Sequence, residues 1–170
     1  MDGSGVITVE AVDRALLAQT AIFAGLSDAV LEKIFAAARI IRIEAGQSVI
    51  EEGDLSVGVF VLCDGELEIC KRGRNGAEFC LAVMKRGDCV GEMSLIDVQA
   101  RSATVRALGA ATLFVLDQAA ITRLYKTDLE VYTLLMLNIA REISRRLRQA
   151  DQTLVDMGVA MQDLWRRSSH

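Results

Sequence analysis

The sequence predicts a mostly β domain with flanking helices: an antiparallel β-roll or jelly-roll barrel of about eight strands, N-terminal helices and a long C-terminal helix. Residues 39–117 alternate short runs rich in Val, Ile and Phe with turn residues, whereas apolar residues on either side recur at helical spacing. The 170 residues suffice for one domain with an appended element. We therefore divide the chain into an N-terminal helical segment (1–38), a β-roll (39–117) and C-terminal helices (118–170).

The strands of the β-roll are expected where β-branched and aromatic residues cluster between glycine-containing turns. Asn75-Gly76 separates two such runs and predicts a hairpin turn, because both residue types accept positive φ. The expected strands are Ala38–Ile43, Ser48–Ile50, Gly58–Cys63, Gly65–Lys71, Glu78–Met84, Cys89–Val90, Ser102–Ala107 and Ala111–Asp117.

Two helices are expected before the strands, over Val9–Leu17 and Asp28–Ala38, because the apolar residues of each fall on one face. Ser27 is a favourable N-cap for the second helix, since a serine hydroxyl can accept a hydrogen bond from a free amide of the first turn. Asp28 then places negative charge where the helix dipole favours it.

After the strands the pattern returns to helix, first over Gln118–Tyr125 and then from Asp128 onward, where we expect Gly158 to interrupt it. The long segment has an apolar seam spaced by threes and fours over roughly four heptads, which is typical of a coiled coil. Its first part can equally pack on the barrel, but beyond about Arg148 little chain remains to cover it, so we expect a parallel homodimer. The seam comprises Tyr132, Leu135, Ile139, Ile143, Leu147, Ala150, Leu154, Met157, Met161 and Leu164.

Composition argues against several classes of protein. The formal charge of −4 gives no general attraction to nucleic acid or to anionic lipid. The chain lacks a membrane span of about 18 apolar residues and an N-terminal secretory signal, so we expect a cytoplasmic protein. Arginines gather late in the chain and are interpreted as a solvated helix face, namely Arg141, Arg145, Arg146, Arg148, Arg166 and Arg167.

Cysteine and histidine usage argues against a metal centre and against an enzyme. Cys63, Cys70, Cys80 and Cys89 form no CxxC pair and lie in strand-like stretches, where a free cysteine behaves as a small apolar residue. The sole histidine, His170, is the last residue, so a cupin-like metalloenzyme lacks its ligands. We expect no metal, no cofactor, no structural disulfide and no catalysis.

The stretch from 87 to 107, GDCVGEMSLIDVQARSATVRA, has the features of an anion site. Gly91 allows a ligand to approach the backbone, and the free amides of a short helix over Glu92–Ile96 attract negative charge. Arg101 can hold a phosphate through charge-assisted hydrogen bonds. Glu92 fits beside an anion if it accepts a hydrogen bond from a neutral hydroxyl, such as a ribose 2′-OH. Taken singly, each residue also has a purely structural interpretation: a turn glycine, a helix-start charge and a surface arginine.

Together these residues resemble the phosphate-binding cassette of the cyclic-nucleotide-binding domain family, which includes the bacterial catabolite activator protein, protein kinase A regulatory subunits and cyclic-nucleotide-gated channels. The two halves of the cassette are Gly91-Glu92-Met93-Ser94-Leu95 and Arg101-Ser102-Ala103-Thr104-Val105. The resemblance covers about residues 20–150. It extends to Ile22–Ser27, to Gly46 with Glu52-Gly53-Asp54, to Phe60 with Gly65, and to Gly87-Asp88.

The resemblance implies a role for each residue of the cassette toward cAMP or cGMP. Glu92 would bind the ribose 2′-OH, and Arg101 the exocyclic phosphate oxygens. The base would rest on strand residues near Leu81 and Val83, capped by the long helix near Leu147 and Ala150. The backbone groups would come from Gly91, Met93, Ser94, Ser102 and Ala103.

Two positions depart from the family pattern. Ala100 stands where many members have proline, which makes the loop less rigid and raises the entropic cost of ordering it. Ser102 follows the arginine in place of the alanine of kinase-A-like sites or the threonine associated with cGMP; we expect cAMP rather than cGMP.

The family's usual output is a second domain, and about twenty residues after Asp151 are too few for a helix-turn-helix domain. We therefore expect no direct DNA binding; the long helix binds a protein partner, or an output domain lies outside this sequence. The alternative is a degenerate domain, kept as a ligand-independent dimerisation and protein-interaction module.

Overall fold

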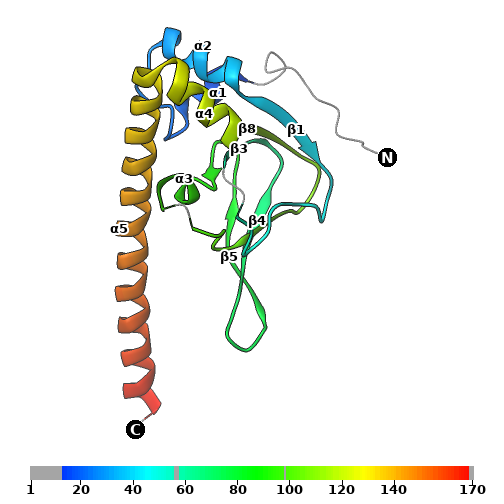
Figure 1. Ribbon diagram of the computed structural model, residues 1–170. Helices are drawn as coiled ribbons and strands as arrows, with labels where there is room; N and C mark the ends of the chain where they lie inside the picture. Colours follow the sequence, from blue (N-terminus) through cyan, green and yellow to red (C-terminus); the bar gives the residue numbers. More distant parts are fainter. Residues whose placement is uncertain (1–12, 56–57, 98, 169–170) are drawn as a thin grey trace.

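Two four-stranded antiparallel sheets form a β-roll in the computed structural model, which describes residues 13–55, 58–97 and 99–168 (Figure 1). One sheet has the strand order β1-β8-β3-β6 and the other β2-β7-β4-β5. The strands are β1 (Arg39–Ile43), β2 (Ser48–Ile50), β3 (Gly58–Asp64), β4 (Leu67–Arg72), β5 (Glu78–Met84), β6 (Cys89–Val90), β7 (Thr104–Ala107) and β8 (Ala111–Asp117). The predicted fold class is confirmed, and the strand bounds differ from the predicted ones by at most two residues.

The inside of the β-roll is an apolar core shared by the two sheets. Leu62, Leu67 and Leu113 have no exposed surface there. The expected turn at Asn75-Gly76 joins β4 to β5, with Gly76 at a φ of 79° and the Asn75 side chain accepting a hydrogen bond from the Ala77 amide. Local turn chemistry thus determines the hairpin, and burial of alternate residues determines which face points inward.

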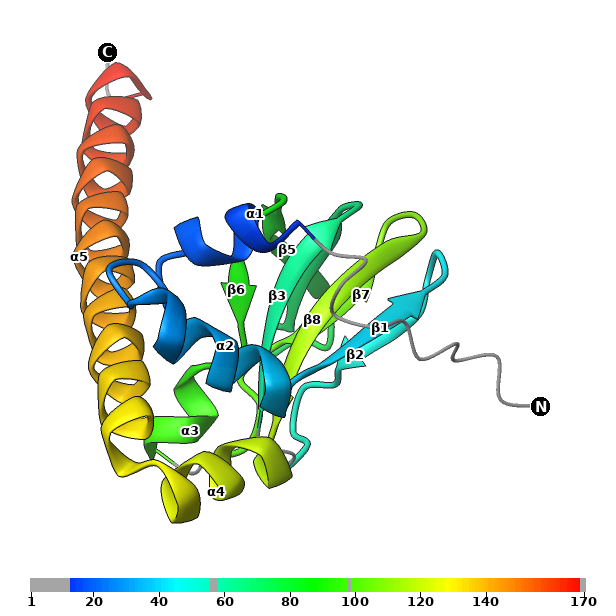
Figure 2. The ribbon, with the colours of Figure 1, turned by 90° about the horizontal axis from the view of Figure 1, so that it is seen from above.

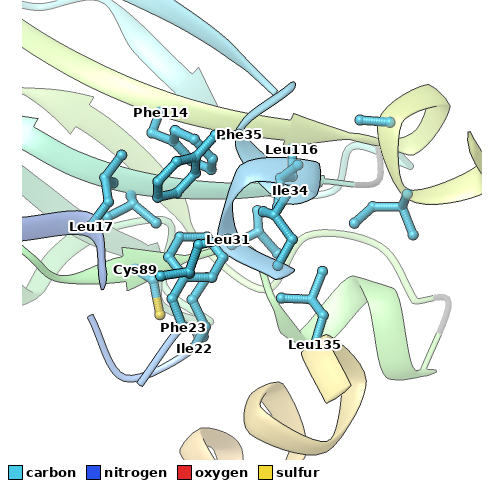
Figure 3. Packing of buried hydrophobic residues seen from close by; sticks show 14 of the residues in the cluster. Leu17, Ile22, Phe23, Leu31, Ile34, Phe35, Cys89, Phe114, Leu116 and Leu135 are labelled. Carbon is cyan, nitrogen blue, oxygen red and sulfur yellow. The ribbon is translucent and has the colours of Figure 1, made fainter. Parts of the chain in front are cut away.

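A second apolar core lies between the first sheet and the helices (Figure 3). Phe23, Phe35 and Phe114 meet edge-to-face there, with ring centroids 5.5–6.2 Å apart. Phe114 comes from β8, an inner strand of the sheet, whereas Phe23 and Phe35 come from the N-terminal helical segment. This core holds the helices on the roll.

The N-terminal helices are α1 (Arg14–Gln19) and α2 (Asp28–Ala37). Part of the predicted first helix, from Val9 to Val12, lies outside the described residues. Ser27 is the N-cap of α2, as predicted, although its side chain makes no cap hydrogen bond. The Ser27 carbonyl accepts from the amides of Val30 and Leu31, and Asp28 supplies charge to the first turn.

The remaining helices are α3 (Met93–Asp97), α4 (Gln118–Thr127) and α5 (Leu129–Ser168). Asp117 and Asp128 cap α4 and α5 through hydrogen bonds from the amides of Ala120 and Val131, at 2.9 and 3.2 Å. The helix α5 continues through Gly158, contrary to prediction, because one glycine costs only about 1 kcal/mol in a helix interior. Among the described residues no helix is both long and apolar enough to span a bilayer.

The N-terminal part of α5, as far as Arg146, contacts the roll, and the rest extends away from it (Figures 1 and 2). Leu135 and Ile139 are fully buried in the helix-facing core. The buried Asn138 amide donates to the carbonyls of Ile22 and Ala24, at 3.2 and 3.1 Å, which joins α5 to the N-terminal segment. From Leu147 onward the large apolar side chains of α5 are exposed: Leu147, Leu154, Val155, Met157, Val159, Met161, Leu164 and Trp165.

Candidate functional site

The seven residues predicted to bind a ligand line a single cavity. It lies between the second sheet, the short helix α3 and the loop that follows it, and Arg146 of α5 closes one side. The predicted residues in its wall are Gly91, Glu92, Met93, Ser94, Arg101, Ser102 and Ala103. Ser102 and Ala103 lie just before β7, outside its ladder, although the sequence predicted that the strand begins at Ser102.

The backbone of Arg101 is held by a neighbouring turn. The Gly53 amide donates to the Arg101 carbonyl at 2.9 Å, and the Arg101 amide donates to the Asp54 carbonyl at 2.8 Å. Gly53 has a φ of 93°, so the turn brings both groups back toward the cassette. The sequence-distant Glu52-Gly53-Asp54 motif therefore positions the arginine.

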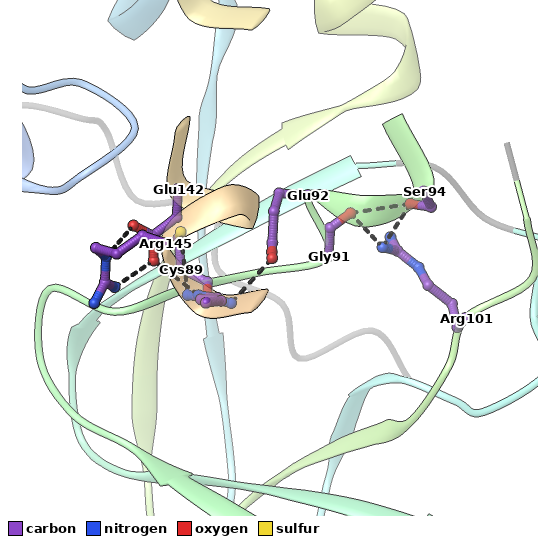
Figure 4. A network of polar contacts seen from close by, with 8 residues as sticks. Cys89, Gly91, Glu92, Ser94, Arg101, Glu142 and Arg145 are labelled. Atoms are coloured by element: carbon purple, nitrogen blue, oxygen red, sulfur yellow. Dashed lines mark hydrogen bonds and ion pairs between the residues drawn. The ribbon is translucent and has the colours of Figure 1, made fainter. Parts of the chain in front are cut away.

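The Arg101 side chain is buried, with 5% of the residue exposed, and points beneath α3 (Figure 4). Its Nη1 donates to the Gly91 carbonyl and to Ser94 Oγ, both at 2.8 Å, and its Nη2 donates to the Gly58 carbonyl at 3.0 Å. These three neutral acceptors fix the plane of the guanidinium. They supply no negative charge to balance it.

The charge of Arg101 is thus left without an ion-pair partner among the described carboxylates, and its Nε is a buried donor with no hydrogen-bond acceptor there. Burial lowers the pKa of Arg101, while the carboxylates of Glu92 and Asp54 act in the opposite direction. A buried cation with an unpaired N–H favours an anionic ligand, because a buried donor without a partner costs roughly 1–3 kcal/mol.

Gly91 is required by the geometry of the cassette. Its φ is 87°, and a Cβ built on it would lie 2.6 Å from both Arg101 Nη1 and the Gly58 carbonyl oxygen. Any other residue would displace the arginine or the start of β3. The sequence identified this glycine by its motif, and the structure adds the reason for it.

Glu92 is also buried, with 3% of the residue exposed, and its partner comes from the long helix. Arg146 Nη1 donates to Glu92 Oε1 at 3.0 Å, and Arg146 Nη2 donates to the Cys89 carbonyl at 2.5 Å (Figure 4). Glu142, one turn earlier on α5, accepts from Arg146 Nε at 2.8 Å. The cassette is therefore joined to α5 through one guanidinium.

Sequence reasoning missed Arg146. Its interpretation as part of a solvated helix face is wrong, because this side chain is 34% exposed and bonds to two carboxylates. The available signal was the pair Glu142 and Arg146, four residues apart, but such pairs are common on exposed helices. Its contact with Glu92 joins residues 54 positions apart in the chain and has no local signature.

The apolar wall of the cavity includes Ile69, Leu81 and Val105 but not Val83 among the described residues. A β-bulge between β4 and β5 pairs Ile69 with Ala82 and Cys70 with Cys80, which leaves Leu81 as the extra residue. The family resemblance implied that both Leu81 and Val83 lie beside the base. The bulge instead sets Val83 opposite Glu68. Leu147 and Ala150 are likewise not part of the described wall, where α5 contributes Arg146.

Glu142 gives the contact between α5 and the cassette a pH dependence. Hydrogen bonds from Arg145 and then from Arg146 lower the pKa of Glu142, although burial opposes this shift. A carboxylate whose folded pKa lies below its unfolded value stabilises the fold above about pH 4.3 and loses that effect as the pH falls through the folded pKa.

We therefore expect Glu142→Gln to lower the free energy of unfolding by about 1–2 kcal/mol at pH 7, a modest figure because Arg145 is half exposed and screened. Urea denaturation of both proteins between pH 7 and pH 3 measures it. The difference should shrink below about pH 4. A difference that stays constant with pH would contradict the assignment.

The chain is similar to known cyclic nucleotide-binding proteins. Residues 40–128, more than half of the chain, match the family model of the cyclic nucleotide-binding domain. The cAMP-dependent protein kinase regulatory subunit of Schizosaccharomyces pombe is 31% identical over 111 residues, which cover 65% of this chain and 26% of that protein. The first curated relatives are longer: the chain spans between 26% and 62% of their length.

Solved structures agree on the fold. The catabolite activator protein of Thermus thermophilus superposes with a TM-score of 0.71 at 26% identity, over 82% of this chain and 63% of that one. A cyclic nucleotide-binding domain from Methylobacillus flagellatus gives a TM-score of 0.74 at 19% identity, over 83% and 79%, which supports the fold alone. Because the family model matches more than half of the residues, this chain belongs to the cyclic nucleotide-binding domain family.

Proposed function

We propose that this chain is a regulatory sensor domain that binds a cyclic nucleotide in the cassette cavity and leaves it chemically unchanged. The observation that carries the proposal is the buried Arg101 guanidinium, whose Nε lacks an acceptor and whose charge lacks a partner among the described residues. A cyclic phosphodiester has one negative charge and would balance it. Glu92, on the other side of the cavity, would accept from the ribose 2′-OH.

Cyclic AMP is the preferred ligand in this proposal. Ser102 follows the arginine, where a threonine is associated with cGMP. Two relatives are named for cAMP, the S. pombe protein and a Thermus thermophilus protein that is 30% identical over 109 residues, whereas a Caenorhabditis elegans relative, 36% identical over 78 residues, is named a cGMP-dependent protein kinase. The choice of cAMP therefore rests on Ser102.

Calorimetric titration of the purified chain with cAMP, cGMP and 5′-AMP tests the proposal. We expect micromolar or tighter binding of cAMP, weaker binding of cGMP and none of 5′-AMP, with the nucleotide recovered intact. Absence of heat with folded, nucleotide-free protein would refute it. That result would favour the alternative of a ligand-independent interaction module, for which one observation speaks: protein acceptors already bind both terminal nitrogens of Arg101.

Signalling through α5 is the second part of the proposal. Ligand binding can shift α5 only to the extent that the ligand has different affinities for two positions of the helix. Arg146 provides the physical connection, because it binds Glu92 of the cassette and Glu142 of its own helix. A ribose hydroxyl that competes for Glu92 would alter this contact. The output in this proposal is a protein partner or a further domain.

The exposed part of α5 supports the expected homodimer. Leu147, Leu154 and Met161 recur every seven residues, and Ala150, Met157 and Leu164 form the second row of the seam. We expect sedimentation equilibrium at micromolar concentration to give twice the 18.5 kDa monomer mass. Leu154→Lys should yield monomer, whereas Val155→Lys, equally exposed but off the seam, should not. A wild-type monomer throughout would exclude this interface.

A further inference from the structure

Strand pairing brings together two cysteines that lie ten positions apart in the chain. Cys70 of β4 is the cross-strand partner of Cys80 of β5, at the bulge. Their Sγ atoms and a carboxylate oxygen of Glu68 all lie within 4.8 Å of one another. Cys80 is exposed, and Cys70 is 2% exposed. Directly opposed residues of antiparallel strands have Cα atoms about 4.5–5.5 Å apart, which falls within the range that a disulfide spans.

The surroundings of this pair disfavour a metal ion. Arg106 donates through Nε to Glu68 Oε1 at 2.8 Å and through Nη2 to Glu78 Oε1 at 2.8 Å, and the same Nη2 lies 3.9 Å from Cys70 Sγ. The guanidinium already balances the carboxylate that a divalent cation would need as a ligand. The same guanidinium lies beside the sulfur and acts to lower the pKa of the Cys70 thiol, although burial outweighs this effect.

We propose that Cys70 and Cys80 are a modification site: a thiol pair that a peroxide converts to an intramolecular disulfide across β4 and β5. The exposed Cys80 thiol loses its proton, and the thiolate attacks the peroxide, which breaks the O–O bond and gives Cys80 sulfenic acid and hydroxide; the hydroxide takes up the released proton and becomes water. The Cys70 thiolate then attacks the Cys80 sulfur, the S–S bond forms, and the hydroxyl leaves as a second water molecule. The two thiols are oxidised by two electrons and the peroxide is reduced by two.

The roles of the two cysteines follow from their burial. Cys80 is accessible to a peroxide, whereas Cys70 is buried. Burial and the carboxylates of Glu68 and Glu78 raise the pKa of Cys70, against the effect of Arg106, so Cys70 is not the thiol that attacks the peroxide first.

The bond would act on the wall of the cassette cavity. Ile69 and Lys71, on either side of Cys70, line that cavity, and so does Leu81, which follows Cys80. A disulfide would hold β5, an edge strand, against β4 and fix the bulge that presents Leu81.

The two remaining cysteines serve as internal controls. Cys63 and Cys89 are buried, and burial raises the pKa of their thiols to about 11 and about 12. They should stay reduced under peroxide exposure that oxidises Cys80, because the thiolate is the reactive form.

The purified chain is first reduced and analysed for bound metal. It is then treated with a modest excess of hydrogen peroxide, and its tryptic peptides are mapped in the absence of a reductant. Trypsin cuts after Lys71, Arg72 and Arg74, so the two cysteines fall on separate peptides unless a disulfide joins them. We expect a linked peptide pair from chains that are not covalently joined to one another. The intact mass of each chain should fall by two hydrogen atoms, and a thiol reductant should reverse the change. Cys80→Ser should give no linked pair, whereas the matched Cys63→Ser should behave as the wild type.

Three results would overturn the proposal. The first is Cys80 oxidised to sulfinic acid while Cys70 remains a thiol, and the second is a linked pair derived from two chains. The third is stoichiometric zinc in the purified protein that protects both thiols, which would assign these residues to a metal site. The measurement needs no nucleotide, so its failure is distinguishable from failure of the proposed ligand binding.

Discussion

Arg101→Ala is expected to weaken cAMP binding at least tenfold. A hydrogen bond to a charged group contributes about 1.5–3 kcal/mol, and the loss of one already corresponds to a factor of ten or more in Kd. The variant also removes the buried positive charge that no described carboxylate balances. Isothermal titration of variant and wild type under the same salt conditions measures the effect.

A loss of affinity must be separated from a loss of structure, because Arg101 also bonds to Gly91, Ser94 and Gly58. Arg101→Lys keeps the charge but lacks the planar fork, so its affinity should lie between those of the wild type and the alanine variant. Arg123→Ala, on the exposed surface of α4, is the matched control and should bind as the wild type does. An alanine variant that remains folded and binds cAMP with an unchanged Kd would remove Arg101 from the site.

Local patterns were sufficient to predict most of the fold. The turn at Asn75-Gly76 and the strands around it were correctly located, because turn chemistry and side-chain alternation act over a few residues. The predicted helical turn of the cassette begins one residue later than expected, at Met93. The predicted interruption at Gly158 was wrong, because the low helix propensity of one glycine has little effect on the stability of a helix of 40 residues.

The site was predictable where its residues are close in sequence and not where they come from distant elements. Gly91 and Arg101 are ten positions apart and share one motif, and both line the cavity. Arg146 reaches Glu92 across 54 positions, and Cys70 meets Cys80 through strand register. A β-bulge leaves Leu81 as an extra residue and sets Val83 opposite Glu68, so that Leu81 lines the described cavity and Val83 does not. A strict alternation of side chains along the strand cannot anticipate this difference. Contacts of this kind depend on tertiary packing.

Gly91→Ala is expected to destabilise the chain by about 2–4 kcal/mol, the sum of the cost of positive φ and the cost of overpacking. The added methyl group would lie 2.6 Å from the Gly58 carbonyl oxygen, which belongs to the backbone of β3 and cannot rotate away, and 2.6 Å from Arg101 Nη1. For a chain of this size the melting temperature should fall by roughly 5–15 °C.

Gly109→Ala is the matched control for this substitution, because a methyl group added at Gly109 would meet no atom of the described residues within 4 Å beyond its chain neighbours, and Gly109 is not among the described glycines with positive φ. Its melting temperature should stay within a few degrees of the wild-type value or rise slightly, since alanine restricts the unfolded chain more than glycine does. Differential scanning calorimetry of the three nucleotide-free proteins gives the comparison. Equal melting temperatures for Gly91→Ala and wild type would mean that the cassette relaxes around the methyl group, and the close approach of Arg101 to Gly91 would then not be a requirement of the fold.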